Sequence, residues 1–216
     1  MTYNFYFVHG WGFREEFWFP LCKFVKKKDI GFIKIVNIES FNKKIVSRVE
    51  KKRIFITHSF GLSWFLKNKI SCHALVNFFS APNFVEFQKK PEKTKKVLEL
   101  MIKNIEKSPD EVMKKFYINC GLENYILNKN VNYKKLRNNL ISLKEDNLVS
   151  DFRNLKIKIL SVLSYQDKIF QPSFEKIKKL HNENHQIKIL KKKNHAFPYL
   201  EPDKAFEIIY KFIKTI

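Results

Sequence analysis

Apolar residues in this chain form short runs, and these runs alternate with stretches in which apolar residues recur at helical spacing. The short runs have the length of β-strands. They are Asn4 to Val8, Phe32 to Val36, Ile54 to Ile56, Ala74 to Phe79, Ile157 to Leu163 and Gln186 to Leu190. Strands that alternate with helices imply right-handed crossovers, so the pattern predicts a mainly parallel sheet flanked by helices, an α/β fold.

Residues 83–150 interrupt this alternation, because they show helical spacing and no obvious strand. We expect them to form a small helical cap, inserted before the strand at Ile157. The core then consists of residues 1–82 and 151–216.

Three helices are predicted within the cap. Apolar residues recur at spacings of three and four from Val97 to Ile105, and again on one face from Tyr133 to Leu143. Between them, Ser108-Pro109-Asp110-Glu111 is typical of a capping box with proline at the first helical position. This motif predicts a helix that ends near Gly121. A final amphipathic helix is expected from Asp203 to Ile213.

Length and composition indicate one globular protein. The 216 residues can bury one substantial core, and 44% of them are hydrophobic. No apolar run reaches the roughly 20 residues that span a bilayer, and the N-terminus is already strand-like, so we expect a cytoplasmic protein. The chain has an odd number of cysteines, and no two of them have a CxxC spacing: Cys22, Cys72 and Cys120. We therefore expect buried thiols without a disulfide or zinc site.

The formal net charge of +21 has two interpretations. It could serve nucleic acid, an anionic membrane or an acidic protein partner, or it could reflect a composition that also favours isoleucine, asparagine and phenylalanine, as expected of a genome rich in A and T. The excess is spread along the whole chain, whereas a nucleic-acid site would cluster it on one element. We therefore expect neither nucleic-acid nor membrane binding.

The segment Thr57-His58-Ser59-Phe60-Gly61 joins an apolar strand to the helical run Leu62 to Lys67. A serine on such a turn projects its hydroxyl outward, and the helix start behind it favours negative charge. Ser59 could also be a polar residue that merely opens a helix. As a nucleophile it would need a base to take its proton and a carboxylate to orient that base.

Asp167 and His195 each follow a predicted strand, at Ile157 to Leu163 and Gln186 to Leu190. The order Ser, Asp, His is the one that α/β-hydrolases use, and the carboxyl ends of strands meet at one edge of an open sheet. We therefore expect Ser59, Asp167 and His195 to converge there.

Other titratable residues offer weaker alternatives. Asp146 and Asp151 precede the strand that Asp167 follows. His181 and His185 are spaced for a metal on a helix but have no evident third ligand, so we expect exposed histidines at a helix end. His9 and His58 flank the serine motif and are expected to shape the site; they are not expected to react.

Several motifs carry a family resemblance along nearly the whole chain. They are Val8-His9-Gly10-Trp11-Gly12 with Glu16-Phe17-Trp18, Ala74-Leu75-Val76 with Ser80-Ala81-Pro82, Asp167 with Pro172, and His195-Ala196-Phe197 with Pro202. With these the chain resembles the pimeloyl-[acyl-carrier protein] methyl ester esterases of biotin synthesis, within the α/β-hydrolase superfamily. The resemblance implies the α/β-hydrolase fold. It departs from the family pattern at Thr57, which replaces a glycine and puts a β-branched side chain at a strained turn, and at Leu62.

The resemblance implies a serine carboxylesterase in which Ser59 is the nucleophile, His195 the general base and then acid, and Asp167 the orienting carboxylate. Backbone N–H groups of Trp11 and Phe60 would form the oxyanion hole. The side chains of Trp11 and Phe116 would line the acyl pocket.

The substrate implied is the methyl ester of a pimeloyl chain on an acyl-carrier protein, and no cofactor or metal is required. Basic residues of the cap would meet the acidic carrier: Lys114, Lys115, Lys134, Lys135 and Arg137. We expect a monomer. The alternatives are a short-chain carboxylesterase or acyl thioesterase of the same fold, and a catalytically silent binding protein.

Overall fold

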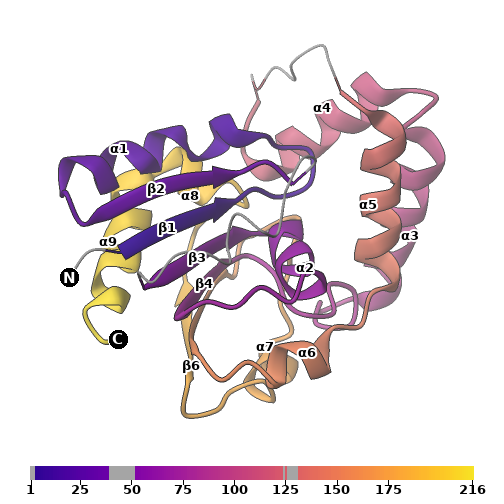
Figure 1. The fold of residues 1–216 in the computed structure, drawn as a ribbon. Helices are drawn as coiled ribbons and strands as arrows, with labels where there is room; N and C mark the ends of the chain where they lie inside the picture. Colours follow the sequence, from indigo (N-terminus) through magenta and orange to yellow (C-terminus); the bar gives the residue numbers. More distant parts are fainter. Residues whose placement is uncertain (1–2, 39–51, 124, 126–130) are drawn as a thin grey trace.

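A six-stranded, all-parallel sheet forms the centre of the protein in a computed structural model, which describes residues 3–38, 52–123, 125 and 131–216 (Figure 1). The strands have the order β2-β1-β3-β4-β5-β6 across the sheet. They are β1 Tyr3–Val8, β2 Gly31–Val36, β3 Arg53–His58, β4 Ala74–Phe78, β5 Lys158–Ser164 and β6 His185–Leu190. The predicted parallel sheet is confirmed, and strand ends differ from the sequence prediction by one or two residues.

Helices cover both faces of the sheet. The chain runs outward from β1 to β2 and then back through β3 to β4, so right-handed crossovers put α1 and α2 on opposite faces. After β6 the chain returns to the first face, where α9 packs against α1. The elements of these layers are η1 Glu15–Trp18, α1 Phe19–Lys27, α2 Phe60–Lys67, α6 Val149–Arg153, α7 Phe174–Lys178, α8 Phe197–Leu200 and α9 Pro202–Ile213.

Three longer helices between β4 and β5 lie to one side of the sheet (Figure 1). We call α3 Pro91–Asn104, α4 Pro109–Cys120 and α5 Tyr133–Glu145 the inserted helices. Helix α3 packs against α5, and Lys67 of α2 binds Asp146 just beyond α5 at 2.9 Å. The division into core and cap stays a prediction, and its ranges include residues 39–51, 124 and 126–130, which lie outside the described part of the chain.

Two details of the helix predictions are wrong. Helix α4 begins at Pro109 and ends beside Gly121 as expected, but the Ser108 side chain makes no capping hydrogen bond. Glu111, the other half of the predicted capping box, binds Lys115 instead, at 2.6 Å. Val97 belongs to the predicted apolar face of α3, yet its side chain is 46% exposed.

Aromatic side chains fill much of the core. Phe5, Phe7, Phe55 and Phe78 of the central strands are fully buried, which accounts for part of the high phenylalanine content. The three cysteines are free and buried, as predicted. Among the described residues no helix is long and apolar enough to cross a membrane.

Candidate active site

Ser59 occupies a strained turn between β3 and α2. Its backbone has φ 51° and ψ −119°, a region that non-glycine residues rarely adopt. The Ser59 N–H donates to the carbonyl of Phe78 at 2.9 Å, which ties the turn to the end of the neighbouring strand β4. Strain of this kind persists where the surrounding structure enforces it, and it is often found at functional sites.

Close backbone packing explains the residues around this turn. A Cβ added to Gly61 would lie 2.7 Å from the carbonyl oxygen of Val8, so only glycine lets α2 start against the end of β1. Thr57 does not disturb the turn, because its hydroxyl donates to the Asn77 Oδ1 at 3.2 Å within the sheet. Asn77 in turn donates to the carbonyl of Ser80 at 2.9 Å.

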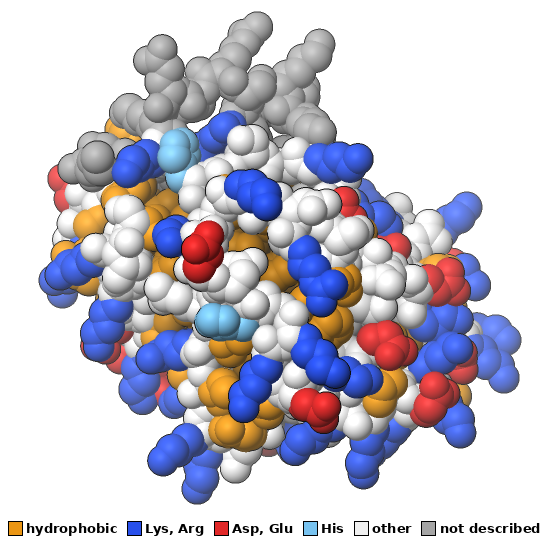
Figure 2. All heavy atoms as spheres, turned by 90° about the horizontal axis from the view of Figure 1, so that it is seen from below, with side chains coloured by type: hydrophobic (Ala, Val, Ile, Leu, Met, Phe, Trp, Pro, Cys, Tyr) orange, Lys and Arg blue, Asp and Glu red, His pale blue; other side chains and the backbone are white. Residues whose placement is uncertain are grey.

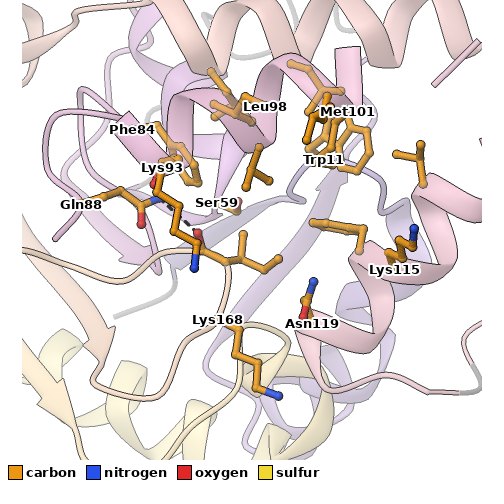
Figure 3. A pocket seen from close by; sticks show the side chains of 18 of the residues that line it. Trp11, Ser59, Phe84, Gln88, Lys93, Leu98, Met101, Lys115, Asn119 and Lys168 are labelled. Carbon is orange, nitrogen blue, oxygen red and sulfur yellow. Dashed lines mark hydrogen bonds between the residues drawn. The ribbon is translucent and has the colours of Figure 1, made fainter. Parts of the chain in front are cut away.

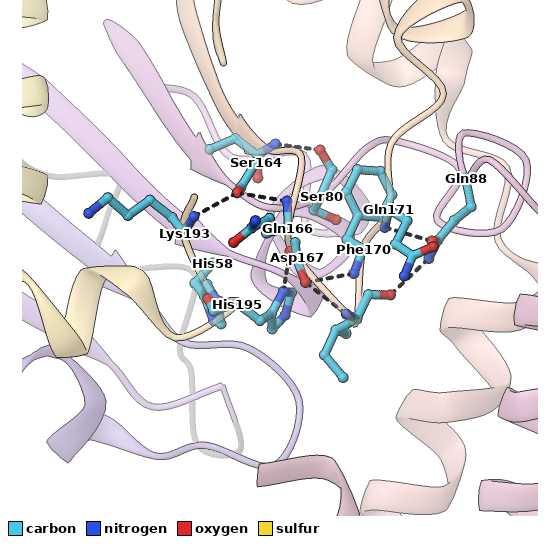
Figure 4. Close-up of polar contacts among 12 residues, drawn as sticks. His58, Ser80, Gln88, Ser164, Gln166, Asp167, Phe170, Gln171, Lys193 and His195 are labelled. Carbon is cyan, nitrogen blue, oxygen red and sulfur yellow. Dashed lines mark hydrogen bonds and ion pairs between the residues drawn. The ribbon is translucent and has the colours of Figure 1, made fainter. Parts of the chain in front are cut away.

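Asp167 and His195 are brought together by the loops after β5 and β6 (Figure 4). The Asp167 Oδ2 and the His195 Nδ1 are 2.7 Å apart, and both side chains are fully buried. The other carboxylate oxygen accepts hydrogen bonds from the backbone N–H groups of Ile169 at 2.7 Å and Phe170 at 3.0 Å. These bonds fix the orientation of the carboxylate.

The contact with Asp167 decides the tautomer of His195. A carboxylate accepts, so the proton is assigned to Nδ1, and Nε2 keeps a free lone pair. This Nε2 is buried and has no hydrogen-bond partner among the residues that the structure describes. A neutral imidazole with an unoccupied lone pair can accept a proton, and Asp167 stabilises the cation that would result.

Ser59 is linked to His195 through its neighbour His58 rather than through a direct hydrogen bond in the described residues. The His58 Nε2 lies 2.9 Å from the carbonyl oxygen of His195, and the two imidazole rings are 4.7 Å apart. Catalytic hydrogen bonds are often long in structures without substrate and shorten only in the complex. The residue that precedes Ser59 thus binds the backbone of His195 directly, at the carboxyl edge of the sheet.

The loop after β1 completes this cluster. Gly12 has a φ of 71°, and the Trp11 indole N–H donates to the carbonyl of Leu136 in α5 at 2.9 Å. The backbone N–H groups of Trp11 and Phe60 donate no hydrogen bond to any residue in the described part of the chain. Phe60 is the first residue of α2, where free N–H groups and the helix dipole favour an anion.

A cavity of about 730 Å³ opens above Ser59 (Figure 3). Its walls are largely apolar and come from the inserted helices and from the segment before α3. The side chains of Trp11 and Phe116, both predicted to line an acyl pocket, face this cavity and contact each other edge to face at 4.7 Å. Further lining residues are Phe84, Leu98, Met101, Leu140 and Leu143.

The predicted basic residues do not all face the cavity. Of the five, Lys115 lines it, but its ammonium is paired with Glu111. Arg137 lies 3.8 Å from Glu106. Lys114 and Lys134 are exposed on α4 and α5, and Lys135 is partly buried on α5. Three lysines that sequence reasoning missed also line the cavity, and none of them has an ion pair with a described residue: Lys90, Lys93 and Lys168.

Gln88 supports the site in a way that the sequence does not predict. It is buried against the Asp167 loop, donating to the carbonyl of Ile169 at 3.1 Å and accepting from the N–H of Gln171 at 2.9 Å. No pattern near Gln88 in the sequence indicates this contact, because it joins segments 83 residues apart.

The alternative candidates have other structural roles. Asp146 is paired with Lys67, away from His195. The prediction that His185 is exposed at a helix end is wrong. His185 begins β6, is 1% exposed, and lies 2.9 Å from the hydroxyl of Ser161. Among the described residues no group of three potential ligands could hold a metal.

Comparisons with known proteins identify similar folds among solved structures but do not assign the chain to a family. No protein-family model matches the sequence, and no curated protein matches it. Solved structures do match: a bromoperoxidase from Bacillus anthracis has a TM-score of 0.81 at 11% identity, covering 99% of this chain and 92% of that one. An esterase from Exiguobacterium antarcticum has a TM-score of 0.77 at 13% identity, with the same coverage. MenH from S. aureus has a TM-score of 0.68 at 15% identity, covering 100% and 95%.

At such identities the likeness shows the fold. Together with the parallel sheet, it confirms that the chain has the α/β-hydrolase fold. Because one fold hosts many chemistries, the function has to be argued from the site.

Proposed function

We propose that this protein is a serine hydrolase of carboxylic esters, with Ser59 as nucleophile, His195 as general base and Asp167 as the orienting carboxylate. One observation carries the proposal: a carboxylate holds one nitrogen of the buried His195 ring, and the other nitrogen has no hydrogen-bond partner among the described residues. The backbone of this histidine is bound by His58, which precedes a serine in a strained turn below a cavity. The esterase named among the similar structures is consistent with it.

The residues support two half-reactions. In the first, the Ser59 oxygen attacks the ester carbon while His195 Nε2 takes the hydroxyl proton. The tetrahedral oxyanion accepts hydrogen bonds from the N–H groups of Trp11 and Phe60, each worth roughly 3 to 4 kcal/mol. Collapse releases the alcohol, which leaves with the proton from His195. In the second, His195 takes a proton from water while the water oxygen attacks the acyl carbon. The bond between that carbon and the Ser59 oxygen then breaks, His195 returns the proton to Ser59, and the acid is released.

Labelling with a fluorophosphonate tests the hydrolase proposal. Wild-type protein should be labelled at one site and should hydrolyse p-nitrophenyl esters, and Ser59→Ala should abolish both. Ser63→Ala, which changes another buried serine of the same helix, is the matched control and should leave labelling intact. Absence of labelling in folded wild-type protein would leave the silent binding protein as the better interpretation.

The finer substrate that we propose is the methyl ester of pimeloyl-acyl-carrier protein, with methanol as the released alcohol and the cytoplasm as the place of reaction. The family resemblance of the sequence motifs is the main support. A largely apolar cavity of about 730 Å³ is suited to an acyl chain. Its lining also contains lysines that have no ion pair with a described residue and are suited to an acidic carrier: Lys90, Lys93 and Lys168. We propose that the inserted helices act as the cap over this chain.

Charge alone does not define the carrier site, since basic side chains are scattered over the face shown in Figure 2. The test is therefore a comparison of substrates. Turnover of the carrier-bound methyl ester should fall as salt rises, while turnover of a small methyl ester should change little. An equal response of both substrates would contradict carrier docking.

Complementation separates this substrate from the alternatives. The chain should restore growth of a biotin auxotroph that lacks its own esterase, and Ser59→Ala should not. If the wild-type protein is active on short-chain esters or acyl thioesters but does not complement, the general esterase or thioesterase interpretation replaces this one.

A further inference from the structure

His58 is a fully buried histidine that the proposed reaction does not use. Its ring stacks on Phe17 at a centroid distance of 4.5 Å, and the rings of Phe13, Trp18 and Phe79 surround it. No carboxylate forms an ion pair with it among the described residues. Burial, then the nearby charges of His195 and His9, hold its pKa well below the usual range, although the hydrogen bond to His195 acts in the opposite direction.

The hydrogen bond of His58 fixes where its proton lies. Nε2 is 2.9 Å from the carbonyl oxygen of His195. A carbonyl oxygen only accepts, so the neutral ring carries its proton on Nε2 and donates it. Nδ1 then bears the lone pair, and it is buried without a partner in the described residues.

This bond connects the two reacting residues of the proposed site. His58 precedes Ser59 in the chain, and it holds the backbone of His195 across 137 residues of sequence. Asp167 holds the ring of the same histidine at 2.7 Å. His195 is therefore fixed at two points, with one contact setting the direction of its ring and the other setting its distance from the serine turn.

A role of His58 as the base itself does not fit the geometry. Its Nε2 is occupied by the carbonyl of His195, and its Nδ1 lies against Gly10, where an added Cβ would be 2.7 Å away. The ring packs among the aromatic residues of η1, whereas Ser59 faces the cavity. His58 thus acts on the reaction through the position of His195.

We propose that His58 is a positioning residue: as a neutral donor to the His195 carbonyl, it sets the distance between the serine turn and the catalytic base. This inference rests on the proposed hydrolase function. A neutral ring is required because a cation 4.7 Å from His195 would oppose the imidazolium that forms when His195 takes the serine proton.

A pair of substitutions tests the role. His58→Phe keeps an aromatic ring in the aromatic surroundings but removes the donor, whereas His58→Gln keeps an N–H near the position of Nε2. For hydrolysis of p-nitrophenyl butyrate we expect His58→Phe to lower kcat by about tenfold or more with little change in KM, since misplacing a catalytic group by an ångström can cost about 100-fold. We expect His58→Gln to recover most of the loss.

The matched control is the same substitution at another buried histidine. The neutral His185 ring donates from Nδ1 to the Leu180 carbonyl at 3.1 Å and accepts at Nε2 from the Ser161 hydroxyl at 2.9 Å, but it lies at the amino end of β6. His185→Phe should lower stability and leave kcat of the folded protein unchanged. If His58→Phe behaves in the same way, His58 is only structural and the inference is overturned.

Nitrogen-15 NMR of the wild-type imidazoles gives a test that needs no folded variant. We expect one ring, assigned to His58, to show the neutral Nε2–H tautomer throughout the pH range in which the protein is folded. A protonated ring or the Nδ1–H tautomer at pH 7 would overturn the inference even if no His58 variant folds. An inactive wild-type protein that resists fluorophosphonate would instead remove the proposed function itself, and this inference with it.

Discussion

Gly10 packs directly against the residues of the proposed site. A Cβ at this position would lie 2.7 Å from the His58 Nδ1 and 3.0 Å from the Ser59 Cβ. We expect Gly10→Ala to lower activity on p-nitrophenyl esters at least tenfold, because the methyl group must displace the serine turn or the His58 ring. Overpacking of this kind also destabilises by about 1 to 3 kcal/mol.

Gly31→Ala separates the two effects of the Gly10 substitution. Its Cβ would meet the Tyr3 carbonyl at the start of β2, far along the sheet from Ser59, and should destabilise without lowering kcat. Urea denaturation and steady-state kinetics on both variants check this. Equal losses of kcat would mean that Gly10 matters only for folding.

A substitution at Asp167 can change which nitrogen of His195 carries the proton while keeping the shape of the side chain. In Asp167→Asn the new side chain would keep an oxygen for the N–H groups of Ile169 and Phe170, but its amide would donate to the His195 Nδ1. The imidazole proton then moves to Nε2, which can no longer accept from Ser59. We expect this substitution to lower kcat by about 10³- to 10⁴-fold. The melting temperature should stay near that of the wild type, and a large fall would indicate a structural effect instead.

The individual site residues that the sequence predicts best are those that follow a predicted strand and have a well-known catalytic role. Asp167 and His195 follow strand ends, so the topology that the apolar pattern predicts is enough to bring them together. The bond from His58 to the His195 carbonyl is not predictable, because it depends on ring orientation within an aromatic cluster. The contacts of Gln88 are not predictable either, since glutamine has no distinctive pattern.

Among the elements, α4 contacts the loop after β1 through apolar side chains and through one hydrogen bond from Tyr117. The Tyr117 hydroxyl donates to the carbonyl of Gly12 at 2.5 Å, and burial raises the pKa of this phenol, so it remains a donor at neutral pH. We expect Tyr117→Phe to destabilise by about 1 kcal/mol, the usual net worth of one hydrogen bond. It should also lower kcat several-fold, because the loop carries the Trp11 N–H.

Tyr210→Phe provides the comparison for this substitution, because Tyr210 stacks on Phe206 in α9 and would keep its ring. Its kcat and its stability should match the wild type. If Tyr117→Phe changed KM alone, α4 would contribute to substrate binding without supporting the loop.

In the inserted helices, the spacing of apolar residues predicts structure more reliably than a short capping motif does. All three helices are found where apolar spacing predicts them, since burial of one face requires it. The predicted capping box before α4 does not form, because Glu111 has a nearer partner in Lys115, one turn along the same helix. Val97 has the apolar spacing but is exposed and lines the cavity instead of packing in the core.

For the whole molecule, the buried histidines couple stability to pH. His58 and His185 are both buried, and burial lowers the pKa of each below its ordinary value near 6.5. In the unfolded chain both would bind a proton as the pH falls through 6.5, while in the folded protein they stay neutral to lower pH. The unfolded state therefore takes up more protons, so the free energy of unfolding should be highest above pH 6.5 and should fall below it.

The expected slope can be measured by urea denaturation between pH 7.5 and pH 5.5. Each histidine contributes at most about 1.4 kcal/mol per pH unit below 6.5, the free energy of one proton. His185→Phe removes one of the two groups, so its free energy of unfolding should depend less steeply on pH over this interval, although the variant is less stable at pH 7.5. Parallel curves for wild type and His185→Phe would mean that His185 takes up its proton over the same pH range in the folded protein as in the unfolded chain, which would contradict the lowered pKa that burial gives it.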